Sequence, residues 1–191
     1  MRRRIGFGVA LIVGALTSCR TAGFKRVFMA LDQKGDRQRT TFYTDTTAIY
    51  CAGELVSGRA DVTVGSTIRA KTLYDPLSDS FVPAPKDVTW IGESAPGKTD
   101  DTMVSFQLLK SPSGVGNEDN LPYPAGTFTC ELSIDGELED TVEFSIDFPA
   151  CPILPPTGGE PCAGWVRPGS ACDGAAGLTC SCDPSGAWVC Q

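Results

Sequence analysis

Six of the nine cysteines in this chain fall within its last 41 residues, between Cys151 and Gln191. The same segment contains few large apolar side chains, so disulfides rather than a hydrophobic core are expected to stabilise it. Zinc is the rival use of clustered cysteines, but the chain contains no histidine, and the spacing lacks the paired Cys-x-x-Cys motifs of a structural zinc site. The tail is therefore predicted to be a small disulfide-stapled module without a metal or cofactor.

The N-terminus has the composition of a secretory signal. Three arginines precede an apolar run from Ile5 to Leu16, which is too short to span a bilayer about 30 Å thick. The next residues, Thr17-Ser18-Cys19, complete a sequence that resembles the bacterial lipobox. This pattern predicts a signal peptide at 1–18 and a lipid on Cys19. The alternative is an ordinary signal peptide cut near Ser18, with Cys19 incidental.

The predicted mature chain would be tethered to a membrane by lipid through residues 19–23. Arg20 stands where many inner-membrane lipoproteins have aspartate, so the lipobox resemblance favours the outer membrane and leaves a periplasmic or a surface-exposed body open. Without residues 1–18 the chain has 13 basic and 23 acidic residues, a net charge of −10. This acidity disfavours nucleic acid as a partner.

The remaining cysteines are even in number, which in an oxidising compartment predicts four disulfides. Cys51 and Cys130 alternate in step with the apolar residues of predicted strands, so they are expected on packed faces. Cys180 and Cys182 are too close to bridge each other comfortably, so each is expected to pair with a different neighbour. The eight cysteines are Cys51, Cys130, Cys151, Cys162, Cys172, Cys180, Cys182 and Cys190.

Apolar and polar residues alternate over much of the segment 24–148. The clearest case runs from Phe128 to Phe148, where alternation on both sides of Asp135-Gly136 predicts a hairpin with one packed face. No segment shows a helical stripe. We therefore predict an all-β chain: an immunoglobulin-like β-sandwich at 24–148, followed by a small disulfide-rich module.

Further boundaries and one pairing follow from this division. A Pro/Gly-rich linker is expected at 149–161 and the cysteine-rich module at 162–191, with Cys151 included in its disulfide framework. An inter-sheet bridge between Cys51 and Cys130 is favoured over pairing of either cysteine with the tail. Two marks of true immunoglobulin domains are missing, since Phe128 replaces the corner tyrosine and no tryptophan follows Cys51 at the usual distance.

The lipobox, the segments RVFMALDQKGDRQRTTFYTDTTAIYC and LPYPAGTFTCELSIDGE, and the terminal C-x-C…G-x-W-x-C pattern allow a comparison. Together they resemble a group of uncharacterised Gram-negative surface lipoproteins with an immunoglobulin-like domain and a cysteine-rich tail. The resemblance covers most of the mature chain. It implies architecture and location, and it implies no activity.

GESAPGKT at 92–99 matches the phosphate-binding loop pattern letter for letter. The residues that follow alternate like a strand, so the helix that such a loop requires is missing, and no nucleotide partner is predicted. Residues 94–97 are instead expected to form a turn. Two acidic loops carry oxygen ligands of the kind that calcium prefers. At Asp32–Asp36 a tight turn is favoured over an ion site, and at Asn117–Asn120 weak calcium binding is an alternative to a solvated loop.

No catalytic residue is predicted, because the absence of histidine excludes Ser-His-Asp and Cys-His catalysis. The carboxylates of Glu137, Glu139 and Asp140 fall on a predicted exposed hairpin arm. Trp165 and Arg167, in the loop between two tail cysteines, are the candidate partner contacts. We expect a non-enzymatic binding or structural protein with a protein or glycan partner; the alternative is a protease inhibitor that presents Arg167.

Overall fold

The computed structural model describes residues 23–56, 62–85, 89–91, 95–96, 102–110, 121–152 and 154–191. Their regular structure is β, apart from a 3-10 turn at Ala175–Gly177. Within these residues no helix is long and apolar enough to cross a membrane. The predicted signal peptide, Cys19 and the loop Asn117–Asn120 lie outside the described residues, so the lipid and the acidic loop stay predictions.

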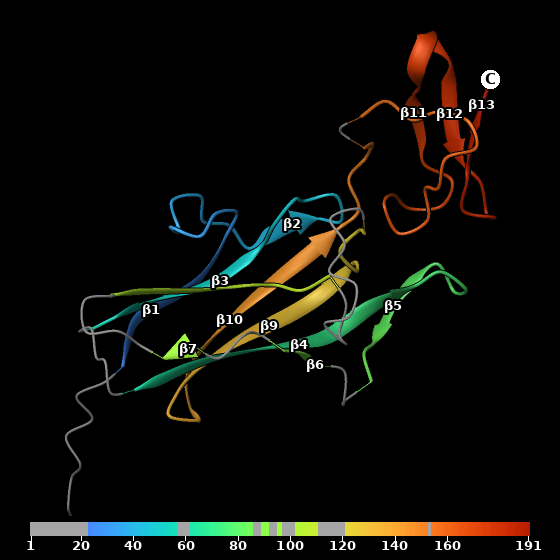
Figure 1. Ribbon diagram of the computed structural model, residues 1–191. Coiled ribbons are helices and arrows are strands. Elements are labelled where there is room, and N and C mark those ends of the chain that lie inside the picture. Colours follow the sequence, from blue (N-terminus) through green and yellow to red (C-terminus); the bar gives the residue numbers. More distant parts are fainter. Residues whose placement is uncertain are drawn as a thin grey trace, which may run out of the picture.

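Two layers of strands make up the larger part of the molecule (Figure 1). The first sheet is antiparallel, in the order β1-β3-β8. The second has the order β2-β10-β9-β4-β5, with β6 and β7 also paired to β4 and with β2 parallel to β10. The first sheet contains β1 (Phe24–Ala30), β3 (Tyr50–Leu55) and β8 (Met103–Gln107). The second contains β2 (Thr41–Tyr43), β4 (Thr63–Asp75), β5 (Ser80–Pro83), β6 (Thr89–Ile91), β7 (Ala95–Pro96), β9 (Gly126–Ile134) and β10 (Glu137–Asp147).

This arrangement is that of an immunoglobulin-like sandwich, as predicted. β1, β3 and β8 take the places of strands A, B and E, while β10, β9, β4 and β5 take those of G, F, C and C′. One strand differs from that plan. After β5 the described chain returns to β4 through β6 and β7, rather than adding a fourth strand beside β8.

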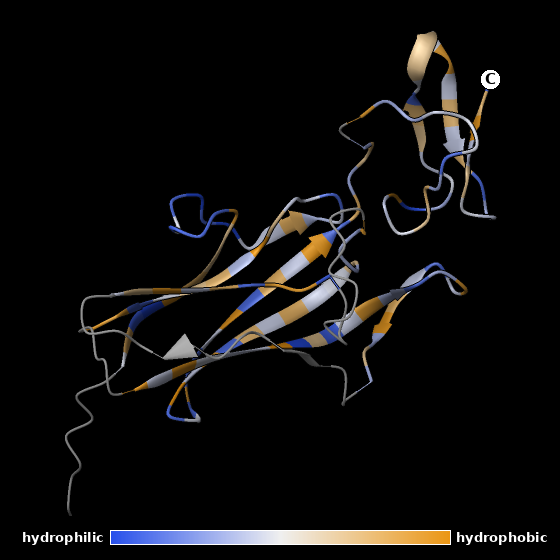
Figure 2. Ribbon diagram, in the orientation of Figure 1, coloured by the Kyte–Doolittle hydropathy of each residue, from blue (hydrophilic) through white to orange (hydrophobic). Residues whose placement is uncertain are grey.

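The predicted hairpin is β9 and β10. Asp135 and Gly136 both have positive φ, 52° and 83°, which is the geometry of a two-residue turn that matches the twist of antiparallel strands. Along β9 the burial alternates at every residue from Gly126 to Ile134. Figure 2 shows the same alternation as bands of hydrophobic and hydrophilic residues along β9 and β10. The hydrophobic face packs into the space between the two sheets.

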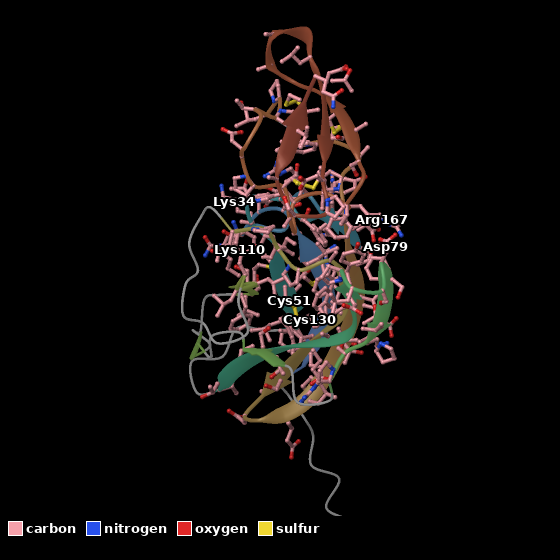
Figure 3. All side chains as sticks on the ribbon, turned by 90° about the vertical axis from the view of Figure 1, so that its right-hand side faces the viewer. Lys34, Cys51, Asp79, Lys110, Cys130 and Arg167 are labelled. Carbon is pink, nitrogen blue, oxygen red and sulfur yellow. A yellow bond between two sulfur atoms is a disulfide. The ribbon has the colours of Figure 1, made fainter. Side chains whose placement is uncertain are left out.

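The core of the sandwich surrounds the disulfide between Cys51 on β3 and Cys130 on β9 (Figure 3). Both cysteines are fully buried, and the predicted inter-sheet bridge is confirmed. Ser66 on β4 lies beside the bridge, with its Oγ 3.6 Å from the Cys130 sulfur. Phe128 stacks on Phe144 at a centroid distance of 5.3 Å. The described core therefore packs aromatic rings near the bridge without a tryptophan.

The tail is a small three-stranded antiparallel sheet. Its strands are β11 (Ala171–Asp173), β12 (Thr179–Cys182) and β13 (Trp188–Cys190), in that order. Three disulfides join Cys151 to Cys172, Cys162 to Cys182 and Cys180 to Cys190. Cys180 and Cys182 thus have different partners, as expected from their spacing. Trp188 is buried among the cysteines.

The segment predicted as a linker is partly built into the tail. The amide of Gly159 donates to the carbonyl of Trp188, and the amide of Trp188 donates to the carbonyl of Glu160. Cys151 is covalently tied to β11 through Cys172. The second half of 149–161 therefore works as an edge of the disulfide-rich module.

Two of the eight residues of GESAPGKT are described. Ala95 and Pro96 form β7, which pairs antiparallel with Thr63 and Val64 at the start of β4. The expectation of a turn is wrong at these two positions, because the chain there is extended against an existing strand. The other residues of the motif lie outside the described part of the chain.

Candidate functional site

A cleft of about 590 Å³ separates the end of the sandwich from the tail module. Its walls come from segments far apart in the sequence: the end of β4, the stretch before β9, the residue after β10 and two loops of the tail. Five prolines and three aromatic residues contribute to the lining. The lining residues are Leu73, Tyr74, Pro76, Lys110, Pro122, Tyr123, Pro124, Ala125, Phe148, Ala163, Gly164, Val166, Pro168, Cys182, Asp183, Pro184, Ser185 and Gly186.

Three aromatic rings brace the sandwich side of the cleft. Tyr74 lies edge-on to Phe148 at a centroid distance of 4.8 Å and edge-on to Phe81 at 5.7 Å. Such perpendicular pairs bring ring edges toward ring faces and hold the rings in fixed positions. Phe81 belongs to β5 and is half exposed. Tyr74 and Phe148 therefore form an aromatic wall of the cleft, and Phe81 packs against Tyr74 outside the lining.

Tyr123 forms the floor of the cleft and is completely buried. Its hydroxyl donates a hydrogen bond to the carbonyl of Leu108, and its amide donates to the carbonyl of Thr44. Burial raises the pKa of Tyr123 to about 12, so the phenol stays neutral at physiological pH. The ammonium of Lys110 lies 5.4 Å from the centre of the Tyr123 ring, a cation–π distance.

A polar latch formed by Asp79, Tyr74 and Arg167 joins the two modules beside the cleft (Figure 3). The guanidinium of Arg167 donates to the Asp79 carboxylate at 2.9 Å and to its carbonyl at 3.1 Å. The hydroxyl of Tyr74 donates to the same carboxylate at 2.7 Å. The hydrogen bond from Arg167, followed by that from Tyr74, holds the pKa of Asp79 below its usual range.

A second link between the modules is a short hydrogen bond. The buried hydroxyl of Thr44 donates to the carbonyl of Trp165 at 2.6 Å. The indole of Trp165 is half-buried and lines a separate groove of about 380 Å³ on the tail. The other residues of this groove are Pro152, Leu154, Pro155, Pro156, Glu160, Pro161 and Trp188.

The two predicted contact residues thus serve the joint between the modules. Trp165 supplies a backbone acceptor to the sandwich, and Arg167 is the cation of the latch. An inhibitory loop must offer its key side chain to the protease. The Arg167 guanidinium is paired with Asp79, while its side chain is 55% exposed. Arg167 as an inhibitor's specificity residue therefore stays a prediction.

The structure also places the acidic candidates. Asp32 accepts hydrogen bonds from the amides of Asp36 and Arg37, which is the favoured tight turn. Glu137, Glu139 and Asp140 lie at the start of β10, at the opposite end of the sandwich from the cleft. Among the described residues, no group of three or more His, Cys, Asp or Glu side chains is placed to hold a metal ion.

Most of the cleft is not predicted from the sequence. Tyr74, Asp79 and Tyr123 are not among the predicted site residues. A local signal exists for the first two, because Tyr74 and Phe81 flank the turn sequence DPLSDS, a pattern typical of a hairpin with aromatic side chains on both arms. Tyr123 carries no such signal, since its partners come from two other segments of the chain.

Comparisons with known proteins add no assignment. No protein-family model and no curated protein matches the chain. Among solved structures, the chain is similar to Pseudomonas fluorescens alkylpurine DNA glycosylase AlkC bound to DNA containing an abasic site analog. The identity is 7% and the TM-score 0.35, over 65% of this chain and 30% of that chain. Similarity at this level carries no argument about activity.

Proposed function

We propose that this chain is a lipid-anchored, non-enzymatic binding protein of a Gram-negative cell envelope. Its ligand is an exposed apolar segment of a partner protein, held in the cleft between the sandwich and the tail. The observation that carries the proposal is the cleft itself, a concave site of about 590 Å³ at the junction of two modules. Binding sites are commonly found where modules meet and are commonly lined by apolar and aromatic side chains.

The titratable groups of the cleft support binding over catalysis. A general acid or base works best with a pKa near the operating pH. Tyr123 has a pKa of about 12, and the hydrogen bond from Ser185 lowers the pKa of Asp183. Each group therefore stays in one ionisation state near neutral pH, which suits a fixed recognition surface.

The lining also favours a protein segment over a glycan. A sugar ring presents many hydroxyls, and each one buried in a site needs a hydrogen-bond partner. The cleft offers proline rings, including Pro76, Pro168 and Pro184, and aromatic side chains, including Tyr74 and Phe148. An apolar protein segment matches these walls because it gains free energy from leaving water and leaves few polar groups unsatisfied.

The position of the N-terminus is compatible with display away from a membrane. Gly23 follows the predicted lipidated Cys19 by four residues, a tether of roughly 14 Å when extended. β1 begins at the end of the sandwich opposite the tail (Figure 1). β4 runs toward the cleft for 13 residues, or roughly 43 Å. A lipid at Cys19 would therefore hold the cleft well clear of the bilayer.

A binding selection tests the proposal. The mature chain would be screened against a displayed random peptide library and, in parallel, against a glycan array. We expect peptides with apolar cores to bind and Pro184→Glu to weaken them at least tenfold, because a carboxylate in the cleft opposes apolar contact. Leu138→Glu, on another exposed side chain at the far end of the sandwich, is the matched control. Glycan binding alone, or equal peptide binding by both variants, would refute the cleft assignment.

The anchor has its own test. Cells expressing the full chain would be labelled with a palmitate analogue. Label is expected on the wild-type protein and its loss in Cys19→Ala, since the thiol is the predicted attachment point. Label that persists in the variant would remove the lipid anchor from the proposal and leave the cleft untouched.

A further inference from the structure

Three cysteines stand in one row across the tail sheet. Cys172 on β11 is directly opposite Cys180 on β12, and Cys180 is directly opposite Cys190 on β13. Only one neighbour can be bonded to Cys180 at a time. It is Cys190, while Cys172 is bonded to Cys151.

We propose that this row is a thiol-triggered disulfide relay, in which attack on the Cys151–Cys172 bridge by an external thiol passes along the sheet and frees Cys190. The inference goes beyond the binding role proposed above and does not depend on it.

The geometry of an antiparallel sheet makes the alternative bond feasible. Directly opposed residues place their side chains on the same face, with Cβ atoms about 4.5–5.5 Å apart. A disulfide joins Cβ atoms about 3.5–4.5 Å apart, and the bonded opposed pair Cys180–Cys190 has its Cα atoms 3.9 Å apart. A bond between Cys172 and Cys180 therefore keeps the strand register and requires the two strands to draw together by about 1 Å.

Solvent exposure gives the relay a direction. Cys151 is exposed, whereas Cys172 and Cys180 are 4% and 0% exposed. An external thiolate can therefore reach the sulfur of Cys151, and the buried Cys172 is the leaving thiolate. Cys162 and Cys182, whose bridge lies in the same module, are 0% and 2% exposed and stand outside the row.

The exchange balances in two steps. The external thiolate bonds to Cys151 and breaks the Cys151–Cys172 bond, releasing the Cys172 thiolate. That thiolate bonds to Cys180 and breaks the Cys180–Cys190 bond, and the released Cys190 thiolate takes up the proton lost by the external thiol. The products are a mixed disulfide on Cys151, a Cys172–Cys180 bond and a free thiol on Cys190, with no net oxidation or reduction.

The consequence is a change in what the tail holds. The proline-rich segment after β10 is no longer tied to β11, because Cys151 has lost its bond to Cys172. The last strand, β13, loses its covalent bond to β12 and keeps only its backbone hydrogen bonds. A thiol in the surroundings would thereby loosen both margins of the module while Cys162–Cys182 still closes its centre.

The test uses the oxidised mature chain and glutathione as the probe. After brief exposure to glutathione, free thiols are alkylated with an isotopically light reagent. The protein is then cleaved on the N-terminal side of each aspartate. The remaining disulfides are reduced, and the new thiols are alkylated with the heavy form of the reagent. Asp173 and Asp183 place Cys190 on a peptide separate from Cys180. We expect light label on Cys190 several-fold above that on Cys180, and, in an aliquot analysed without the reduction step, glutathione on Cys151 in an amount equal to the light label on Cys190.

Two outcomes in the wild-type chain would overturn the relay. Equal light label on Cys180 and Cys190 would mean direct reduction of their bridge, and light label on Cys172 with none on Cys190 would mean that the exchange stops at the first step. A double variant, Cys151→Ala with Cys172→Ala, removes the entry bridge and should leave Cys190 unlabelled at the same glutathione concentration. Labelling of Cys190 in that variant as in the wild type would also contradict the proposal.

Discussion

The sandwich and the tail are both antiparallel β-structures, yet different forces hold them. The main buried cluster of the sandwich contains 17 described residues, of which two are cysteines. The tail cluster contains six, of which four are cysteines, with Val166 and Trp188 the others. A long hairpin and two facing sheets can bury a continuous apolar interior, and a module of about 40 residues cannot. In the tail, disulfides supply the stabilisation that a larger apolar core supplies in the sandwich.

The comparison predicts that loss of one tail bridge has a larger structural effect than loss of the sandwich bridge. In Cys162→Ala with Cys182→Ala, the tail loses the bond that closes 20 residues and two of its six buried side chains. We expect the module to unfold and its segment to be cut at Asp173 and Asp183 by an aspartate-specific protease. The sandwich should resist under the same conditions; equal resistance of the tail would show that its hydrogen bonds suffice.

The corresponding change in the sandwich is Cys51→Ala with Cys130→Ala. Their bridge spans 79 residues, and loss of such a bond costs about 4 kcal/mol in the chain-entropy model. The hydrophobic core remains, so we expect a folded sandwich with a lower free energy of unfolding, measured by urea titration of tryptophan and tyrosine fluorescence. A sandwich that no longer folds would contradict the prediction that the sandwich, unlike the tail, folds without its disulfide.

A smaller effect is expected where the cleft meets the core. Tyr123→Phe keeps the ring and removes the hydroxyl that donates to the carbonyl of Leu108. Net loss of one such hydrogen bond costs about 1 kcal/mol. The same titration should therefore give a modest decrease, with no change at the tail. A neutral result would assign Tyr123 to packing alone.

The smallest effect is expected at the latch between the modules. Asp79→Asn removes the charge that pairs with Arg167, and an exposed ion pair of this kind contributes little to folding. Neither module should lose stability, while the distance between them should vary more widely, measured by fluorescence energy transfer between a dye on each module. Glu54→Gln, which breaks an ion pair far from the junction, is the control.

The latch also predicts a pH dependence with a definite sign. Because Arg167 and Tyr74 hold the pKa of Asp79 below its usual range, the carboxylate favours the closed arrangement at every pH above its unfolded value of about 3.9. That contribution is lost as the pH falls through the depressed folded-state pKa. The distance distribution between the modules should broaden in that pH range in the wild-type protein. Asp79→Asn has no carboxylate to protonate at this position, so its distribution should not broaden through this group. Identical acid broadening in both proteins would exclude Asp79 as its source.

Local patterns explain what could be predicted from the sequence. The β9–β10 hairpin follows from alternation around Asp135-Gly136, and the Cys51–Cys130 bridge follows from two cysteines on packed faces. The tail pairing could not be chosen, because six cysteines allow 15 arrangements. The cleft is even harder to predict from the sequence. Asp79 and Arg167 are 88 residues apart, and nothing near either residue points to the other.

Apolar burial holds the sandwich, and disulfides hold the tail. Amide hydrogen exchange, read peptide by peptide in the oxidised and the fully reduced protein, tests this difference most directly. We predict that full reduction abolishes protection in β11, β12 and β13 and leaves β4, β9 and β10 protected, because the apolar core of the sandwich remains when the Cys51–Cys130 bridge is open. Retained protection in the tail strands, or simultaneous loss in both modules, would contradict the account.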